Sequence, residues 1–304
     1  MRLKGGVKIK NIAIVLNWNA ADATMRCVES ILNFAVNIDC IVVVDNCSED
    51  DSFDKLNKCA ELSGWESVYV VGNHINSGYA GGNNFGINFA VKTFPEASVF
   101  WVVNNDAYLE SDAFSPMLTA VTHDLKAICG SVIVDSASRK VECFGGGELY
   151  PLLGKARLVG SGASLEGVSN FKNVPDYIMG CSMAFDKSLI EEVGYMEESY
   201  FMYSEEVDWQ FRARKKNFYI KVCPHSVVMH LGSMSSGGRG WFYHYYRNRA
   251  AVMFNRRFYG FSVALISVFM LSMFSICKEF VRPRIMISGI KGAIAGLFKR
   301  FGDG

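Results

Sequence analysis

The chain has 304 residues, of which half are hydrophobic and a fifth are charged. This composition excludes global disorder, and the length allows one large domain or two ordinary ones. With 28 glycines and 6 prolines, the chain also falls outside the fibrous and low-complexity classes. Residues 1–238 carry 20 Lys and Arg against 28 Asp and Glu, whereas residues 239–304 carry 11 against 2. An acidic body with a basic tail indicates an anionic partner for the tail, such as a membrane surface or a nucleic acid.

The nine cysteines are odd in number, scattered along the chain and never spaced as Cys-x-x-Cys. A disulfide framework or a zinc knuckle is therefore not expected, and a reducing cytosol fits best. The first eleven residues contain no apolar stretch, so no secretory signal is expected either.

Short apolar runs alternate with helical stretches over the first 135 residues. The expected strands cover residues 12–16, 40–44, 67–71, 99–103 and 127–134, and the expected helices cover 21–34, 51–62, 80–93 and 111–122. Nearly continuous runs of Val and Ile separated by helices are typical of a parallel sheet that is covered on both faces. The sequence therefore predicts an α/β fold with a mostly parallel central sheet.

The second half of the chain is less regular. Residues 136–173 are rich in Gly and Ser, and we expect strands and a mobile loop over the sheet rather than a separate domain. Beyond them we predict a strand over 177–185, a helix over 205–216 with Ser204 as its N-cap, and an apolar run that ends at His230.

Polar residues gather where the first four predicted strands end. In parallel sheets, ligands bind in the crevice beyond the carboxyl ends of the strands. Residues 17–19 follow the first strand, 45–48 the second, 72–78 the third and 104–106 the fourth, and these segments are rich in Asn, Asp and Gly. Turn chemistry explains part of this enrichment, and a ligand site at this edge explains the cluster.

Asp106 lies just beyond the fourth strand, two residues after the amide side chain of Asn104. A carboxylate at this place can hold Mg²⁺ or Mn²⁺ against a diphosphate, because both ions favour oxygen ligands and Mg²⁺ usually shares its shell with substrate phosphates. The alternative is a simple turn, since Asn-Asn-Asp is rich in turn formers.

Asp45 and the glycine-rich run 76–86 follow the second and third strands. A carboxylate at Asp45 can accept a hydrogen bond from a pyrimidine base or a ribose hydroxyl; the alternative is an Asx turn or a helix cap. Glycines let a backbone approach a ligand closely, and a helix that begins near Ala80 would direct N–H groups at an anion. The run matches neither G-x-G-x-x-G nor the P-loop. The alternative is a strained turn packed on the sheet.

Glu205, Glu206 and Asp208 lie at the start of the 205–216 helix. Acidic residues in a first turn complement the helix dipole and need no further role. The aromatic run 200–203 before them nevertheless indicates a pocket wall, beside which a carboxylate could serve as a base. His230 lies at another strand exit and is either structural or a ligand.

Taken in order along the chain, these motifs resemble the family-two inverting glycosyltransferases of GT-A fold, and most of all their bacterial rhamnosyltransferase-type branch. The resemblance covers about residues 10–255 and includes a Tyr-Arg-Asn run over residues 246–248. It implies a nucleotide-sugar donor, dTDP-rhamnose or a UDP-sugar, bound over the sheet. It also implies a saccharide acceptor, lipid-linked, that arrives from the other side.

The resemblance also implies how the donor is held. Asp45 would contact the nucleoside, and Asp106 would hold Mg²⁺ or Mn²⁺ under the diphosphate with help from His230. The family's Asp-x-Asp motif is Asn104-x-Asp106 in this chain, which removes one negative charge from the metal site. The other residues implied in donor binding are Asn17, Asn19, Asn76, Gly78, Tyr79, Gly82, Asn83, Asn104, Asn105 and Arg247, the last of which could neutralise phosphate.

The resemblance implies a single displacement, in which a carboxylate takes the proton of the attacking acceptor hydroxyl. Glu206 matches the position of the family's base, which is usually an Asp, and Asp208 is the alternative. Two other classes of protein remain open. A sugar-nucleotide pyrophosphorylase would need a basic, Gly-rich first strand exit, which this chain lacks, and a non-catalytic nucleotide-sugar-binding protein would fit the missing first Asp.

We expect two units: a GT-A catalytic domain over 1–238 and a basic helical extension over 239–304. Residues 258–277 are uncharged and close to the length needed to span a bilayer, but basic residues on both sides argue against a single span. In the stretch 285–301, apolar residues at helical spacing predict an amphipathic helix lying in the membrane interface; they are Ile287, Ile290, Ile294 and Leu297.

From this tail we expect peripheral attachment to the cytoplasmic face of a bacterial cell membrane, where the site would meet its lipid-linked acceptor. The alternative is a pair of helices packed on the catalytic domain or on a second subunit of a homodimer. A nucleic-acid partner is not expected.

Overall fold

The computed structural model describes residues 10–170, 174–232 and 240–302. The strands in these residues are β1 (Asn11–Asn17), β2 (Cys40–Asp45), β3 (Val68–Gly72), β4 (Val99–Asn104), β5 (Ala107–Tyr108), β6 (Ala127–Asp135), β7 (Val141–Phe144), β8 (Gly146–Tyr150), β9 (Lys155–Leu158), β10 (Tyr177–Ile178), β11 (Ser182–Asp186) and β12 (Tyr219–His230). The helices are α1 (Ala21–Phe34), α2 (Ser52–Leu62), α3 (Gly78–Thr93), α4 (Phe114–His123), α5 (Ser188–Val193), α6 (Glu205–Arg214), α7 (Trp241–Phe258), α8 (Phe261–Glu279) and α9 (Pro283–Phe298), with short 3-10 turns η1 (Pro151–Leu153), η2 (Leu165–Asn170) and η3 (Glu198–Tyr200).

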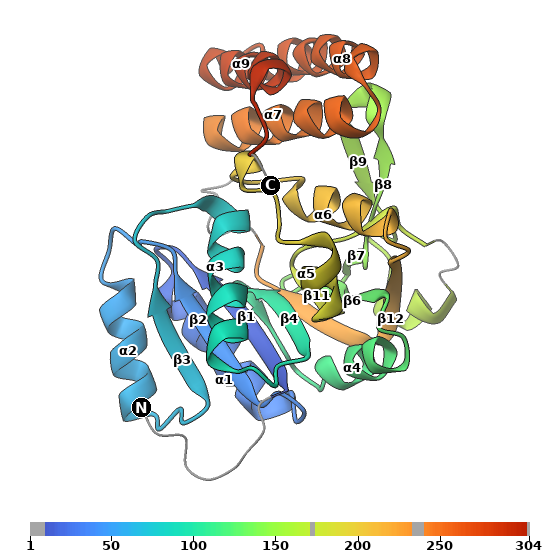
Figure 1. The fold of residues 1–304 in the computed structure, drawn as a ribbon. Helices are drawn as coiled ribbons and strands as arrows, with labels where there is room; N and C mark the ends of the chain where they lie inside the picture. Colours follow the sequence, from blue (N-terminus) through green and yellow to red (C-terminus); the bar gives the residue numbers. More distant parts are fainter. Residues whose placement is uncertain (1–9, 171–173, 233–239, 303–304) are drawn as a thin grey trace.

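The large sheet has the strand order β3-β2-β1-β4-β11-β6-β12-β5, with β7 paired to β6 (Figure 1). Strands β3, β2, β1 and β4 are parallel, as predicted. Strand β11 lies antiparallel between β4 and β6, so the whole sheet is mixed. The predicted α/β fold is confirmed, and its parallel half is the one that carries the four predicted strand exits.

Helices cover both faces of this sheet. Alternate residues of a strand point to opposite faces: Ala13 and Val15 of β1 pack with α1, α2 and α4, whereas Ile12 and Ile14 pack with α3, α5 and α6. Because both faces are buried, the strands need apolar residues at every position, which is why they read as continuous Val and Ile runs.

Some predicted elements differ in detail from the structure. The strand expected over 177–185 is divided into β10 and β11, which belong to different sheets. Helix α4 begins three residues later than expected, because Asp112 Oδ1 accepts hydrogen bonds from the backbone N–H groups of Phe114 and Ser115. Ser204 does occupy the N-cap position of α6, but it has a φ of 67° and its side chain makes no capping hydrogen bond.

The strands expected between residues 136 and 173 are present. Strand β7 joins the large sheet, whereas β8 and β9 form a hairpin that pairs with β10. This small sheet rises from the large one toward the C-terminal helices (Figure 1). Residues 171–173 lie outside the described residues, and the mobility of this stretch stays a prediction.

The C-terminal helices form a layered unit on top of the body (Figure 1). Helix α7 packs on α6 and η3 through aromatic side chains such as Phe211 against Phe254. Helix α9 packs on α7 through Gly289, Gly292 and Gly296; a Cβ atom at Gly292 would lie 2.1 Å from the carbonyl oxygen of Tyr245. The predicted division between 238 and 239 falls in residues 233–239, outside the described residues.

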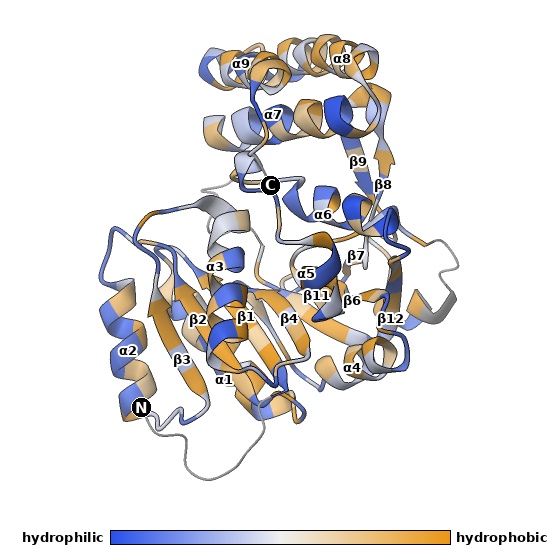
Figure 2. Cartoon of the chain, in the orientation of Figure 1, coloured by the Kyte–Doolittle hydropathy of each residue, from blue (hydrophilic) through white to orange (hydrophobic). Residues whose placement is uncertain are grey.

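The amphipathic helix expected over 285–301 is present as α9, and its contact with a membrane stays a prediction. The glycine stripe faces α7, while Ile287 and Ile294 are exposed. Helix α8 has the same pattern: its buried residues include Ser267, Ser275 and Glu279, and its large exposed side chains are Phe261, Leu265, Ile266, Phe269, Met273 and Ile276. Figure 2 shows the hydrophobic colouring of α8 and α9 in this outer layer.

Candidate active site

The exits of β1, β2 and β4 are joined by a buried chain of hydrogen bonds. Asn105 Nδ2 donates to Thr24 Oγ1 at 3.0 Å, and Thr24 Oγ1 donates to Asn17 Oδ1 at 2.7 Å. Asn17 Nδ2 in turn donates to Asp45 Oδ1 at 2.8 Å. Asn17 and Thr24 are fully buried, so Asn17 supports Asp45 from behind. Thr24 of α1 was not among the predicted site residues, because nothing in its sequence context marks it.

Asp45 is held at the end of β2 by the residues that follow it. Its Oδ1 accepts from Ser48 Oγ at 2.6 Å, and its Oδ2 accepts from the Ser48 backbone N–H at 3.0 Å. The Asx turn weighed as the alternative is therefore present, and it fixes the direction of the carboxylate. Asn19 lies at the exposed surface beside it, with a φ of 51°, and accepts a hydrogen bond from the Glu49 backbone.

The glycine-rich run after β3 forms a tight turn centred on Asn46. Asn46 Nδ2 donates to Asn76 Oδ1 and to the Gly78 carbonyl, and the Gly78 N–H donates to Asn76 Oδ1. Gly78 has a φ of 71°, and a Cβ atom there would lie 2.0 Å from the carbonyl oxygen of Phe201. Only glycine fits this position, which joins the turn to the loop before α6.

The space left by the missing side chains of the α3 glycines is filled by neighbouring protein atoms. A Cβ atom at Gly82 would lie 2.4 Å from a methyl group of Leu16, and one at Gly86 would lie 2.7 Å from Val44. The close backbone approach predicted for this run is therefore used, at these two positions, to bring α3 onto β1 and β2.

Tyr79 lies close to both acidic parts of the site. Its hydroxyl donates to the Gly180 carbonyl at 2.7 Å. Burial raises the pKa of Tyr79, and the charges of Glu206, Glu205 and Asp106 raise it further. The candidate base and the candidate metal ligand are thus near the same side chain. Asn83 donates to the Tyr79 carbonyl, and its own buried Oδ1 makes no hydrogen bond among the described residues.

The pairing of β5 with β12 brings Asp106 and His230 together. Ala107 is the register partner of His230, and Leu231 N–H donates to the Asp106 carbonyl. As a result Asp106 Oδ1 lies 3.3 Å from His230 Nε2. Glu142 of β7, a residue that the sequence gave no reason to select, lies 2.7 Å from His230 Nδ1.

Asp106 and His230 carry donor atoms of kinds that divalent metals accept. Asp106 Oδ1 is buried and makes no hydrogen bond within the described residues. Glu142 can hold the Nδ1–H of His230 so that Nε2 faces Asp106, the usual second contact of a metal-binding imidazole. Burial lowers the pKa of His230, but Asp106 and Glu142 outweigh burial and raise it to about 10. Two carboxylates therefore attract positive charge to the place that a metal would occupy.

The residues present fit Mg²⁺ or Mn²⁺ with Asp106 and His230 as protein ligands. No group of three or more His, Cys, Asp or Glu side chains in the described ranges could hold a metal alone, so phosphate and water oxygens would complete the shell. Asn104 ends β4 beside this site, where its backbone N–H donates to the Cys181 carbonyl.

Glu206 lines a cavity of about 450 Å³ between the small sheet, α6 and α7. Tyr177, Tyr203 and Arg247 line the same cavity. Burial raises the pKa of Glu206 to about 7, the range that suits a general base. The neighbouring Glu205 is buried, and burial and the charge of Glu206 hold its pKa well above the usual range.

Asp208, two residues further on, is fully buried and fully paired. Its Oδ1 accepts from Arg212 Nε at 2.7 Å, and its Oδ2 accepts from Tyr200 Oη and Arg257 Nη1, both at 3.0 Å. A carboxylate with these partners has no free lone pair directed at a substrate. The geometry therefore favours Glu206 over Asp208 as the base.

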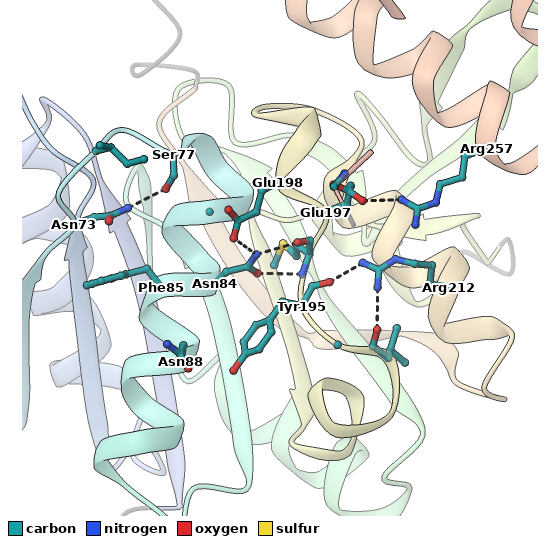
Figure 3. Close-up of a pocket in the computed structure, with 16 residues that line it drawn as sticks. Asn73, Ser77, Asn84, Phe85, Asn88, Tyr195, Glu197, Glu198, Arg212 and Arg257 are labelled. Carbon is teal, nitrogen blue, oxygen red and sulfur yellow. Dashed lines mark hydrogen bonds and ion pairs between the residues drawn. The ribbon is translucent and has the colours of Figure 1, made fainter. Parts of the chain in front are cut away.

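A second cavity, of about 840 Å³, lies between α3, the segment 193–198 and the ends of α6 and α7 (Figure 3). The labelled polar side chains pair across it: Asn84 Nδ2 donates to Glu198 Oε1, and Arg257 Nη1 to Glu197 Oε2. These bonds tie α3 and the C-terminal helix α7 to the same segment. Arg257 also pairs with Asp208 of α6. This ion pair, the clamp that holds α7 to α6, therefore lies at the border of the cavity.

Comparison with known proteins gives the class of protein. A family model described as glycosyl transferase family 2 matches residues 12–193, and the chain belongs to this family. The chain is 28% identical over 187 residues to the low-salt glycan biosynthesis hexosyltransferase Agl10 of Haloferax volcanii. That match covers 60% of this chain and 55% of the relative, so the chain spans about half the length of the curated relative that it matches.

Solved structures show the same fold. GalNAc-T7, crystallised with UDP, GalNAc and Mn²⁺, superposes with a TM-score of 0.65 at 13% identity, over 96% of this chain and 55% of its own. The mannosyltransferase PcManGT of Pyrobaculum calidifontis, in complex with GDP-Man and Mn²⁺, superposes with a TM-score of 0.60 at 13% identity, over 95% and 86%. Residues 1–349 of S. aureus TarS give 0.54 at 14% identity, over 95% and 81%. This chain therefore belongs to glycosyl transferase family 2 and has a GT-A-like α/β fold.

The first prediction separates the two acidic residues of α6. Asp208→Asn removes the charge that pairs with both Arg212 and Arg257. Breaking a buried ion pair costs about 3–5 kcal/mol. We expect the free energy of unfolding, measured by urea denaturation, to fall by about this amount. Glu206→Gln, two residues away, has no ion partner to lose and should unfold near the wild-type midpoint. Equal stabilities for the two variants would contradict the assignment of Asp208 as the clamp.

The second prediction concerns the metal. Calorimetry of UDP or dTDP should show tighter binding with Mn²⁺ than with EDTA, and Asp106→Asn should abolish that difference. Glu142→Gln should weaken the Mn²⁺-dependent part about 10–100-fold, because Glu142 orients His230. Glu148→Gln, the same change on the neighbouring strand β8, is the matched control. Mn²⁺-independent binding in the wild type would overturn the metal site.

Proposed function

We propose that this glycosyltransferase inverts the configuration of the sugar that it transfers, from a nucleoside diphosphate donor to a hydroxyl of a lipid-linked saccharide. The observation that carries the proposal is the separation of two acidic sites near Tyr79. Asp106 with His230 suits the leaving diphosphate, and Glu206 opens into a cavity that suits the acceptor. Asp45 lies at the adjoining strand exit, where it would contact the nucleoside.

The proposed step is a single displacement. Glu206 takes the proton of the acceptor hydroxyl as the hydroxyl oxygen forms a bond to the anomeric carbon. The bond from that carbon to the diphosphate breaks, and its electron pair leaves with the nucleoside diphosphate. A divalent metal, when bound, neutralises charge that builds on the leaving group, which is the kind of electrostatic stabilisation that is usually largest in such reactions. Tyr79 and the chain from Asn105 to Asp45 keep the surrounding strand exits rigid.

For the sugar, we propose rhamnose from dTDP-rhamnose, with a UDP-sugar as the second candidate. The support is the motif order along the chain, with Asn104-x-Asp106 at the metal site. The similar solved structures contain different nucleotides and sugars: UDP and GalNAc in GalNAc-T7, and GDP-Man in PcManGT. They support a nucleotide sugar in general. The bacterial surface polysaccharide in which the sugar would be placed, such as an O-antigen, follows from the same resemblance.

For the location, we propose that α8 and α9 lie in the cytoplasmic face of the cell membrane. By length and composition, α8 is the one described helix that could cross a bilayer. It packs along η1 and the other C-terminal helices. Its Ser267, Ser275 and Glu279 are buried against the protein, while Leu265, Phe269 and Met273 are exposed. Small and polar residues inside with apolar residues outside is the pattern of helices that pack within lipid. Basic residues at the end of α8 suit an anionic leaflet.

The third prediction tests the base. Glu206→Gln should slow the release of UDP or dTDP from a nucleotide sugar about 10²–10⁴-fold and leave nucleotide binding intact. In the wild type, the rate should fall as the pH drops through about 7, since the carboxylate must be unprotonated to accept a proton. Glu166→Gln, an exposed position, is the control. A wild-type rate in Glu206→Gln, or a rate that rises below pH 7, contradicts this role.

The fourth prediction tests the membrane face. The full chain should float with vesicles that contain phosphatidylglycerol, and Leu265→Ser with Phe269→Ser should abolish flotation without loss of helical circular dichroism. The control is Val36→Ser with Leu62→Ser, since these side chains are even more exposed, at 78% and 77%, but lie on the body. If the wild type is instead a lipid-free dimer that the α8 substitutions dissociate, the face is a subunit interface and the membrane proposal fails.

A further inference from the structure

A cleft of about 350 Å³ lies between α7 and α8 beside the small sheet, and besides Arg282, which pairs with Glu279, three cations line it. They come from three separate elements: Lys155 from β9, Arg247 from α7 and Lys278 from the last turn of α8. The small sheet rises to these helices (Figure 1), which is how β9 reaches them.

The three cations lack neutralising partners. Within the described ranges, no carboxylate forms an ion pair with any of them; Glu279, which also lines the cleft, pairs with Arg282 and lies 3.9 Å from His244. Lys155 Nζ instead lies over the ring of Phe274, and among the residues that the structure describes the Arg247 side chain makes one long hydrogen bond, to Asn248. Burial lowers the pKa of Lys155, and the charges of Lys278 and Arg247 lower it further. Like charges held this close favour an anion among them.

The cleft adjoins the cavity of Glu206 on one side. Lys155, Tyr243 and Arg247 line both this cleft and the cavity that contains Glu206. A molecule with a hydroxyl at Glu206 would therefore have the cationic cleft as its neighbour. Figure 1 shows the same order of elements, from α6 through α7 to α8.

On the other side, the cleft borders the apolar outer layer. Leu271 and Phe274 of α8 line the cleft, while Phe269, Met273 and Ile276 of the same helix are exposed. The base Glu206, the cationic cleft and the apolar outer face of α8 thus lie next to one another in this order. This is the order of parts in a sugar joined through phosphate to a lipid chain.

We infer that Lys155, Arg247 and Lys278 bind the phosphate or diphosphate that links the acceptor saccharide to its lipid. The inference rests on the proposed function, because it assigns one end of the same acceptor. The sugar then reaches Glu206, and the lipid chain lies along the outer face of α8. Arg247, which the sequence pattern associated with the donor phosphates, belongs in this arrangement to the acceptor.

The fifth prediction uses the full chain and vesicles of phosphatidylcholine with a few per cent of undecaprenyl phosphate. A second set of vesicles carries the same fraction of phosphatidylglycerol. We expect the wild type to bind the prenyl phosphate vesicles about ten-fold more tightly, a difference of about 1.4 kcal/mol. Lys155→Gln with Lys278→Gln should remove this preference. Lys291→Gln with Arg300→Gln, which removes two exposed cations at the C-terminal end of the same layer, should keep it.

Equal binding of the two vesicle types, with nucleotide binding intact, would overturn this inference and leave the proposed function standing. So would an equal loss of both vesicle types in the cleft variant, because the cleft would then bind general anionic headgroups. A wild type that binds no UDP, dTDP or GDP with Mn²⁺ would overturn the proposed function, and the acceptor assignment with it.

Discussion

The arrangement of the site depends on a buried chain of hydrogen bonds that runs from Asn105 through Thr24 and Asn17 to Asp45. Parallel strands place their carboxyl ends at one edge, but loops at that edge are free to vary. In a low-dielectric interior a fully satisfied polar network is strong, and a broken one is costly. This chain of hydrogen bonds therefore fixes the ends of β1, β2 and β4 relative to one another. Asp106 is fixed with them, because it is the next residue after Asn105.

The opposite wall of the site is supplied by the second half of the sheet. The antiparallel pairing of β5 with β12 brings His230 to Asp106, although 124 positions separate them in sequence, and β7 adds Glu142. Helix α6 supplies two carboxylates with different environments. Asp208 is bound by two guanidinium groups and holds α7 in place. Glu206 lines a cavity, forms no ion pair with another described residue, and has a raised pKa. Environment, more than residue type, assigns the two roles.

The sequence predicted the parallel half of the sheet and its strand exits well, because the signal there is local. Runs such as residues 40–44 are apolar at every position, and the polar residues follow each run at once. It did not predict the split of 177–185, since strand partnership depends on contacts far along the chain. Thr24 and Glu142 were missed for the same reason: each acts through a partner brought by tertiary structure. The sequence predicted the helical spacing of the apolar residues of α9 but not the close packing of its glycines on α7, since that packing depends on a partner helix.

The C-terminal helices bear on the proposed reaction through the side chains that they expose. Several of their small and polar residues face the protein, and large apolar side chains form the outer surface. The proposed function joins a donor site over the sheet and a base on α6 to this surface as the proposed membrane contact. It depends most on where the metal and the diphosphate bind.

Anomalous diffraction from crystals of the full chain grown with Mn²⁺ and UDP or dTDP tests this most directly. The account predicts one strong Mn²⁺ peak at bonding distance from Asp106 Oδ1 and His230 Nε2, with the diphosphate on the same ion and the nucleoside beside Asp45. A nucleotide bound elsewhere, or a Mn²⁺ peak that contacts neither Asp106 nor His230, would contradict it.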